Sequence, residues 1–238
     1  MQSVEHVSDT QPVGQSPLLV VVLGMHRSGT SAITKILCEA GFFVGEGPDL
    51  MKGDQWNRDG YFERWSVYNA NNIILYLCEG TWRNPPKESD IRQIKIDPKI
   101  ETLIKVYKGH QRSVMKDPRL CLTFPVWQRV LGDNARIIRV NRQPEAVVAS
   151  LMKRDGLSQQ ESLALWGIYT ERASRYSKSY PVFSMKYEDL FLANRPELLE
   201  ELSRFLHIQT NLEHIAKQVV DPGLQHHGRD NNISDRNK

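Results

Sequence analysis

A glycine-bounded stretch near the N-terminus carries side chains suited to binding an anion. It reads GMHRSGTS from Gly24 to Ser31 and follows the apolar run LLVVVL. A glycine loop between a strand and a helix points backbone N–H groups at a phosphate, and the helix dipole adds to the attraction. The alternative is an ordinary strand-to-helix turn with hydroxyl caps. The candidate anion-binding residues are His26, Arg27, Ser28, Gly29, Thr30 and Ser31.

The loop lacks the lysine of a nucleoside triphosphatase. Gly24 and Gly29 satisfy the G-x-x-x-x-G spacing, but Thr30 stands where that lysine belongs. The lysine reaches the β- and γ-phosphates, and a strand ending in an acidic residue supports the magnesium ion. The strand-like run RIIRVNR ends in a basic residue instead. The sequence therefore predicts phosphate binding without a metal site.

A second candidate anion site lies in the middle of the chain. Arg142 follows an apolar run, and Ser150 lies eight residues further on. An arginine that leaves a strand can lay its guanidinium along the next helix, where a hydroxyl two turns later shares the same phosphate. Arg142 and Ser150 are therefore predicted to bind one phosphate together.

The segments around these motifs alternate between strand and helix patterns. A continuous run of β-branched and apolar residues is typical of a strand buried on both faces of a parallel sheet. Apolar spacing of three and four residues marks the helices. This alternation predicts an α/β fold. The expected strands are Leu18–Leu23, 113–115, Ala135–Val140 and Pro181–Met185, and the expected helices include Ser28–Ala40, Pro144–Lys153 and Ser162–Tyr176.

Two internal stretches and both ends depart from this alternation. Gly45–Gly60 is rich in glycine, aspartate, asparagine and proline, and Asn84–Pro98 is charged and carries three prolines, so we expect surface loops in both places. The polar ends, residues 1–16 and 225–238, are predicted to be disordered tails. One folded domain is expected over residues 17–224.

The amino-acid composition indicates a single globular domain and argues against several classes of protein. The chain has 238 residues, of which 40% are hydrophobic and 25% charged, which suits one globular domain. A net charge of +3 argues against a general nucleic-acid surface. The three scattered cysteines indicate neither a disulfide framework nor a zinc site. With no apolar signal segment or membrane span in the sequence, we expect a cytoplasmic protein.

The motifs, in this order, resemble those of sulfotransferases that use 3′-phosphoadenosine 5′-phosphosulfate (PAPS), in particular the bacterial-type branch. VMKDPRL at 114–120 and MKYEDL at 185–190 resemble the middle and late motifs of that family. DPGLQHH at 221–227 resembles its C-terminal segment more loosely. The resemblance covers about residues 18–224 and implies a three-layer α/β/α fold around a mainly parallel sheet. The glycine loop would hold the 5′-phosphosulfate, and Arg142 and Ser150 the 3′-phosphate.

The resemblance also implies the chemistry of the site. An acceptor hydroxyl or amine would attack sulfur in line while negative charge grows on the leaving phosphate, so cations must lie there. Arg27 is the first candidate, at the bridging oxygen and the 5′-phosphate. Lys116 is the second, near the sulfuryl group or the adenine. The alternative for Lys116 is a surface lysine paired with Asp117.

The resemblance offers more than one candidate for the general base. Pro118 occupies the position of the histidine found in cytosolic members. Other branches use a glutamate from just after the first helix, and Glu63 lies in the corresponding region. The alternative makes Glu63 a capping acid for the helix that follows it. Asp117 and His26 are the other candidates, although His26 fits contact with phosphate or sulfate better.

The remaining expectations concern the adenine and the acceptor. Tyr187 matches a family tyrosine close to the nucleotide, whereas Trp166 fits the core of its helix better. The Gly45–Gly60 loop would border the acceptor pocket. The acceptor is a small molecule, a carbohydrate or a lipid, and the sequence leaves it and the oligomeric state open. A P-loop phosphotransferase and a non-catalytic protein that binds PAPS or its product, 3′-phosphoadenosine 5′-phosphate (PAP), are the alternative functions.

Overall fold

The computed structural model describes residues 16–57 and 60–220. Among them, four strands form one sheet in the order β2-β1-β3-β4, and each neighbouring pair is parallel. The predicted tails fall outside these residues except for Ser16, as does the 221–227 motif. The strands are β1 Leu18–Leu23, β2 Arg112–Lys116, β3 Ala135–Asn141 and β4 Val182–Lys186.

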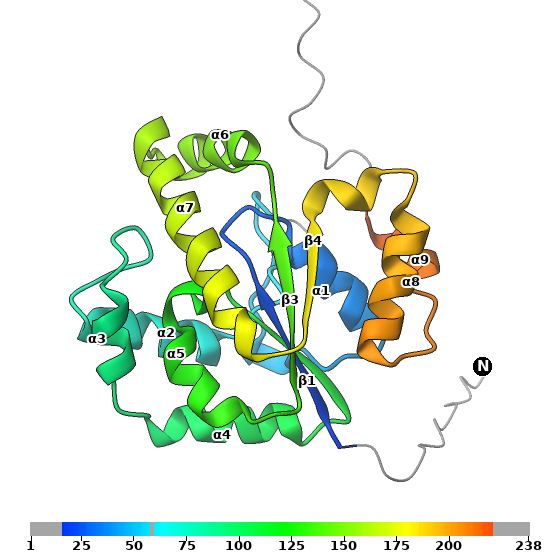
Figure 1. The fold of residues 1–238 in the computed structure, drawn as a ribbon, viewed down its shortest axis with the longest axis horizontal. Helices are drawn as coiled ribbons and strands as arrows, with labels where there is room; N and C mark the ends of the chain where they lie inside the picture. The colour runs from blue at the N-terminus through cyan, green and yellow to red at the C-terminus, as the bar shows by residue number, and fades with distance from the viewer. Residues whose placement is uncertain (1–15, 58–59, 221–238) are drawn as a thin grey trace, which may run out of the picture.

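Helices cover both faces of this sheet, so the fold has three layers (Figure 1). Successive side chains of a strand point to opposite faces, and β1 therefore contributes Val20 and Val22 to one core and Val21 and Leu23 to the other. On the Val20 side lie α1 (Thr30–Glu39), α8 (Arg195–Leu206) and α9 (Leu212–Val219). On the Val21 side lie α2 (Trp65–Leu77), α3 (Glu88–Gln93), α4 (Pro98–Lys108), α5 (Leu120–Leu131), α6 (Pro144–Asp155) and α7 (Gln159–Tyr176).

The carboxyl ends of the strands meet at one edge of the sheet. β1 runs there into the glycine loop, β2 ends at Lys116 and β3 at Asn141. β4 leads into a 3-10 turn, Tyr187–Phe191. Ligands of open parallel α/β sheets bind at this edge, where neighbouring strands lead to helices on opposite faces. The glycine loop, the segment around Arg142 and the motifs at 114–120 and 185–190 therefore converge at the position where such a fold binds ligands.

The predicted strands and the α/β class are confirmed, but one loop prediction is wrong. Asn84–Pro98 contains helix α3, and Pro98 begins α4. Its polar composition concealed Ile91, which is fully buried and belongs to the core between α3 and α5. A single apolar residue per turn gives no periodic signal, so tertiary packing decides the conformation of so short a helix.

The described residues contain no helix that is both long and apolar enough to cross a membrane.

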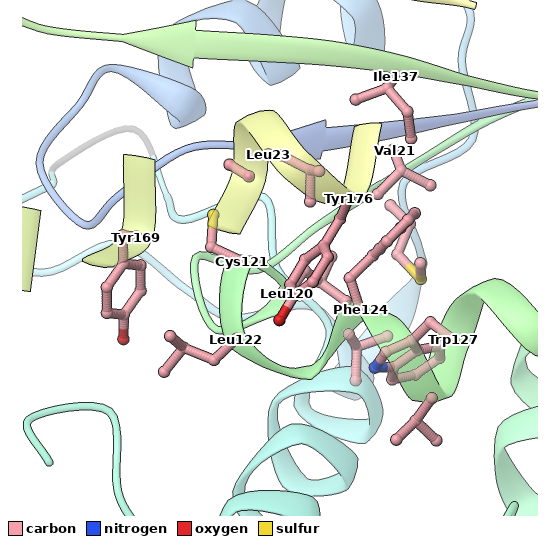
Figure 2. Packing of buried hydrophobic residues seen from close by; sticks show 14 of the residues in the cluster. Val21, Leu23, Leu120, Cys121, Leu122, Phe124, Trp127, Ile137, Tyr169 and Tyr176 are labelled. Carbon is pink, nitrogen blue, oxygen red and sulfur yellow. The ribbon is translucent and has the colours of Figure 1, made fainter. Parts of the chain in front are cut away.

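The core on the Val21 side depends on large side chains from α5 and α7. Figure 2 shows Phe124, Trp127 and Tyr176 gathered beneath β1. Trp127 has no exposed surface, and its indole N–H donates to Asn71 Oδ1 at 2.8 Å. Burial of this side chain therefore combines apolar packing with a satisfied polar group.

Replacing Trp127 with alanine is expected to lower the free energy of unfolding by about 3–5 kcal/mol, because it leaves a cavity and removes one of the two hydrogen bonds that Asn71 Oδ1 accepts, the other coming from the Thr123 hydroxyl. Urea denaturation followed by circular dichroism measures the change. Trp65→Ala is the matched control, since Trp65 is 44% exposed and the loss there should be small. Equal losses in the two variants would contradict this account of the core.

Candidate functional site

Close packing explains both glycines of the loop. A Cβ at Gly24 would lie 2.6 Å from the carbonyl oxygen of Val140, so only glycine lets β1 run this close to β3. Gly29 has a φ of +83°, and a Cβ there would lie 2.0 Å from the Tyr187 ring. The loop is thus pressed against β3 and the Tyr187 turn, and α1 begins directly after it at Thr30. The first amides of α1 lack carbonyl partners four residues back and are available to a ligand.

Arg27 joins the glycine loop to the second motif. Its Nε donates to Ser150 Oγ at 2.8 Å, across from α6. Arg142 donates from its guanidinium to the carbonyl oxygen of Arg27 at 2.9 Å. Arg27, Arg142 and Ser150 therefore form one cluster, although 123 positions separate Arg27 from Ser150. Burial and the charges of Arg154 and Arg142 lower the pKa of Arg27.

Tyr187 completes this cluster. The Arg142 guanidinium carbon lies 4.7 Å from the centre of the Tyr187 ring, a cation–π distance. Arg142 Nε is buried without a hydrogen-bond partner in the described part of the chain. Trp166, expected in the core, is half-buried and its indole N–H donates to the Arg142 carbonyl at 3.3 Å. This residue therefore supports the position of Arg142.

A second cluster lies at the end of β2, where Lys116 and Glu63 form a buried ion pair. Lys116 Nζ lies 2.6 Å from Glu63 Oε1 and 3.1 Å from Ser31 Oγ, and it also donates to the Tyr61 carbonyl. Lys116 is 2% exposed and Glu63 6%. Burial raises the pKa of Glu63, and the neighbouring Lys116 opposes that shift only in part.

The alternative partner for Lys116 is wrong. Asp117 is fully buried and accepts hydrogen bonds from the Arg119 backbone N–H at 2.7 Å and the Arg119 guanidinium at 3.2 Å. Arg119 also donates to Asn72 at 3.1 Å. Lys116 and Asp117 have different partners because successive side chains along an extended segment point to opposite sides.

The alternative role of Glu63, as the capping acid of α2, is also wrong, because Asp49 fills that role. α2 begins at Trp65, and the carboxylate of Asp49 accepts from the Ser66 backbone N–H at 2.8 Å. Asp49 also accepts from the Arg64 guanidinium at 2.6 Å. Asp49 could not be predicted as the cap from the sequence, because it lies 17 residues before Ser66 and only the folded chain brings the two residues into contact.

His26 has aromatic neighbours that the sequence did not reveal. Its ring lies 4.7 Å from the Trp82 ring and 5.9 Å from the Tyr169 ring, and it is almost fully buried. Burial, followed by the charges of Arg119 and Arg154, holds the pKa of His26 well below its usual range. Its Nε2 atom is buried without a hydrogen-bond partner among the described residues. His26 is therefore neutral near pH 7.

The remaining predicted residues lie at the start of α1. The side chains of Ser28 and Thr30 are buried there, and Ser31 is half-buried. Ser31 Oγ contacts the second cluster through Lys116 and the Gly45–Gly60 loop through Asn57. The loop predicted to border an acceptor therefore also contacts Ser31, which the sequence predicts to bind phosphate. A hollow of about 510 Å³ is lined by Gly47, Pro48, Leu50 and Lys52 of this loop and by Trp65 at the start of α2.

These groups fit a ligand with two separate anionic ends. One cluster presents the guanidinium groups of Arg27 and Arg142 and the Tyr187 ring, and Arg142 Nε has only a long ion-pair contact, 4.0 Å from Glu188 Oε1. The other cluster presents an ammonium group beside a carboxylate. The Tyr187 ring lies so close to the start of α1 that position 29 has no room for a side chain. The described residues contain no group of three His, Cys, Asp or Glu side chains that could hold a metal ion.

Comparison with known proteins gives one family match. The family model described as a sulfotransferase domain matches residues 18–228. No curated protein sequence matches the chain. Among solved structures, a sulfotransferase from Mycobacterium tuberculosis is 13% identical at a TM-score of 0.47, with 87% of this chain and 72% of that chain covered.

Two further solved structures also have low sequence identity to this chain. The sulfotransferase domain of a Synechococcus olefin synthase is 18% identical at a TM-score of 0.46, with 91% of this chain and 86% of that one covered. A retinol dehydratase solved with androsterone and inactive cofactor PAP is 12% identical at a TM-score of 0.39, with 87% and 65% covered. The assignment of this chain to a family therefore rests on the sulfotransferase domain match over residues 18–228.

The lowered pKa of His26 predicts how stability depends on pH. The unfolded chain binds a proton at His26 near pH 6.5, whereas the folded chain resists it. The contribution of His26 is thus present above about pH 6.5 and is lost as the pH falls from there toward its folded pKa. Thermal melts from pH 8 to 5 should show wild type losing stability relative to His26→Gln. A difference that stays constant with pH would contradict a neutral, buried His26.

Proposed function

Because this chain belongs to the sulfotransferase domain family, whose members transfer sulfuryl groups, we propose that it takes the group from PAPS and passes it to an acceptor hydroxyl or amine. The supporting observation is the arrangement of the two clusters about the glycine loop. Ser31 Oγ touches Lys116 of one cluster, while Arg27, four residues earlier, touches Ser150 of the other. A donor with a phosphosulfate and a separate phosphate matches this arrangement.

Within this proposal, the first cluster binds the nucleotide. Arg142 and Ser150 hold the 3′-phosphate, Arg27 and the first amides of α1 hold the 5′-phosphate, and the Tyr187 ring lies along the adenine. Arg142 Nε has no hydrogen-bond partner among the described residues, and its N–H is therefore able to donate to this phosphate. The remaining loop residues, His26, Ser28, Gly29, Thr30 and Ser31, line the phosphosulfate. His26, being neutral, offers a hydrogen bond and not a charge.

The second cluster performs the chemistry in this proposal. PAPS supplies an activated sulfuryl group whose bond to the 5′-phosphate breaks as the bond to the acceptor oxygen forms. Glu63 takes the proton from the acceptor hydroxyl, and its raised pKa makes it a stronger base than an exposed carboxylate. Once Glu63 is neutral, the Lys116 ammonium loses its counter-ion and its charge acts on the anion beside it. Proton removal and electrostatic stabilisation are thereby coupled through one ion pair.

Arg27 serves the leaving group in this scheme. It lies at the turn of the loop with a φ of +67°, and its guanidinium extends toward α6. Negative charge builds on the bridging oxygen as the sulfur–oxygen bond breaks, so a fixed guanidinium there lowers the barrier without reorganisation. Asp117 is a weaker candidate base than Glu63, because its carboxylate is already engaged by Arg119.

The acceptor is proposed only as a class. It is a small molecule, a carbohydrate or a lipid alcohol, and the hollow lined by Pro48, Lys52 and Trp65 offers both apolar and cationic contacts to such a group. We also propose residues 17–224 as one P-loop-like domain that works in the cytoplasm.

The nucleotide assignment can be tested with the product. PAP should bind without metal and raise the melting temperature, whereas ADP, which lacks the 3′-phosphate, should bind at least about tenfold more weakly. Calorimetric titration measures both affinities, and added EDTA should not change them. Arg142→Ala should remove the preference for PAP. Equal affinity for PAP and ADP in the wild type, or a requirement for magnesium, would refute the proposed site.

The base assignment can be tested with Glu63→Gln. The glutamine keeps the shape and accepts a hydrogen bond from Lys116 but takes no proton at neutral pH, so turnover should fall about 10²-fold. PAP affinity should stay close to that of the wild type. Glu200→Gln, on the exposed face of α8, is the matched control and should keep full turnover. Full activity in Glu63→Gln would transfer the role to Asp117 and then to His26.

A further inference from the structure

A tight turn in the Gly45–Gly60 loop is organised by one carboxylate. Asp54 Oδ1 accepts from the backbone N–H groups of Trp56 at 2.8 Å and Asn57 at 3.0 Å. The other carboxylate oxygen accepts from the Tyr61 hydroxyl at 2.7 Å. Two backbone hydrogen bonds between Asp54 and Asn57 close the turn. The conformation of Asn57 is therefore set from both sides before any ligand binds.

This turn lies against the groups proposed to hold the donor. The Trp56 carbonyl accepts from Arg27 at 3.3 Å, and Asn57 Nδ2 lies 3.1 Å from Ser31 Oγ. The Tyr61 carbonyl accepts from Ser31 Oγ at 3.3 Å and also from Lys116. The turn thus contacts the same three donor groups that face the phosphosulfate in the proposed function.

The hydrogen bonds of Ser31 define the orientation of the Asn57 amide. A serine hydroxyl has one hydrogen and two acceptor positions. Its hydrogen goes to the Tyr61 carbonyl, and Lys116 fills one acceptor position. Asn57 must therefore present its NH₂ group to the other. An amide NH₂ carries two hydrogens, and Ser31 takes only one of them.

We propose that Asn57 is a further donor-site residue, whose second amide hydrogen binds an oxygen of the sulfuryl group to be transferred. The inference rests on the proposed function and adds sulfuryl recognition to it. Asn57 lies beside Ser31 and one contact from Lys116, where a sulfuryl group between Arg27 and Glu63 would be placed. The three oxygens of the sulfuryl group need hydrogen-bond donors, and the Ser31 hydroxyl hydrogen is already donated to the Tyr61 carbonyl. A neutral amide binds them without adding a charge that must later be released.

PAPS and PAP separate this role from a structural one, because PAP has both phosphates but no sulfuryl group. Affinities for each should be measured calorimetrically without acceptor, so that no turnover occurs. Asn57→Asp replaces the donor with a repelling carboxylate and should weaken PAPS about tenfold or more while PAP affinity stays unchanged. Asn57→Ala should show a smaller loss of the same kind. Gln55→Glu is the matched control, since it makes the same amide-to-carboxylate change on the same exposed turn.

Each other outcome counts against the proposal. An equal loss of PAPS and PAP affinity would mean that Asn57 only maintains the loop, and no loss for either would mean that it has no role. An equal loss of PAPS affinity in Gln55→Glu would mean that the effect of Asn57→Asp comes from long-range charge repulsion and not from a lost hydrogen bond. Failure of the wild type to bind PAP would instead overturn the proposed function, and that result is distinct from any effect of Asn57.

Discussion

The buried ion pair between Lys116 and Glu63 is the interaction on which the candidate site depends. Two opposite charges stay buried at 2.6 Å only if other polar groups satisfy them, and Ser31 and the Tyr61 carbonyl do so for Lys116. The pair thereby joins the end of β2, the start of α1 and the segment that leads into α2. Removing either partner would leave an uncompensated charge in the interior, which typically costs about 3–5 kcal/mol.

The close approach of β1 to β3 is the second constraint, because it brings the two anion-binding motifs together. Gly24 passes so near the Val140 carbonyl that a side chain there is excluded. Arg142 follows two residues after Val140 and reaches the carbonyl of Arg27, and α6 then returns Ser150 to the Arg27 guanidinium. The neighbouring β4 delivers Tyr187 to the same place. Parallel strand order thus converts three distant motifs into one cluster.

Local patterns in the sequence determined the class of fold and predicted the glycine loop, Arg142 and Ser150 as candidate binding residues. The apolar run of β1 and the helical spacing after it predict a strand, a glycine loop and a helix, and all three are present. Arg142 and Ser150 were recognisable because their spacing is a property of one strand-to-helix connection. Lys116 and Glu63 were identified only through resemblance to a family, since nothing near them in the sequence marks a buried pair.

Tertiary structure alone decided which of these residues meet and what each one contacts. Lys116 pairs with Glu63 across 53 positions and not with the adjacent Asp117, and Asp49 caps a helix from 17 positions away. The buried Ile91 makes a helix of a segment with loop-like composition. Asn57 contacts Ser31 at the start of α1, although 26 positions separate the two residues. Local patterns report the conformation of neighbouring residues, whereas these contacts depend on strand order and the return paths of loops, which side-chain packing over the whole domain selects.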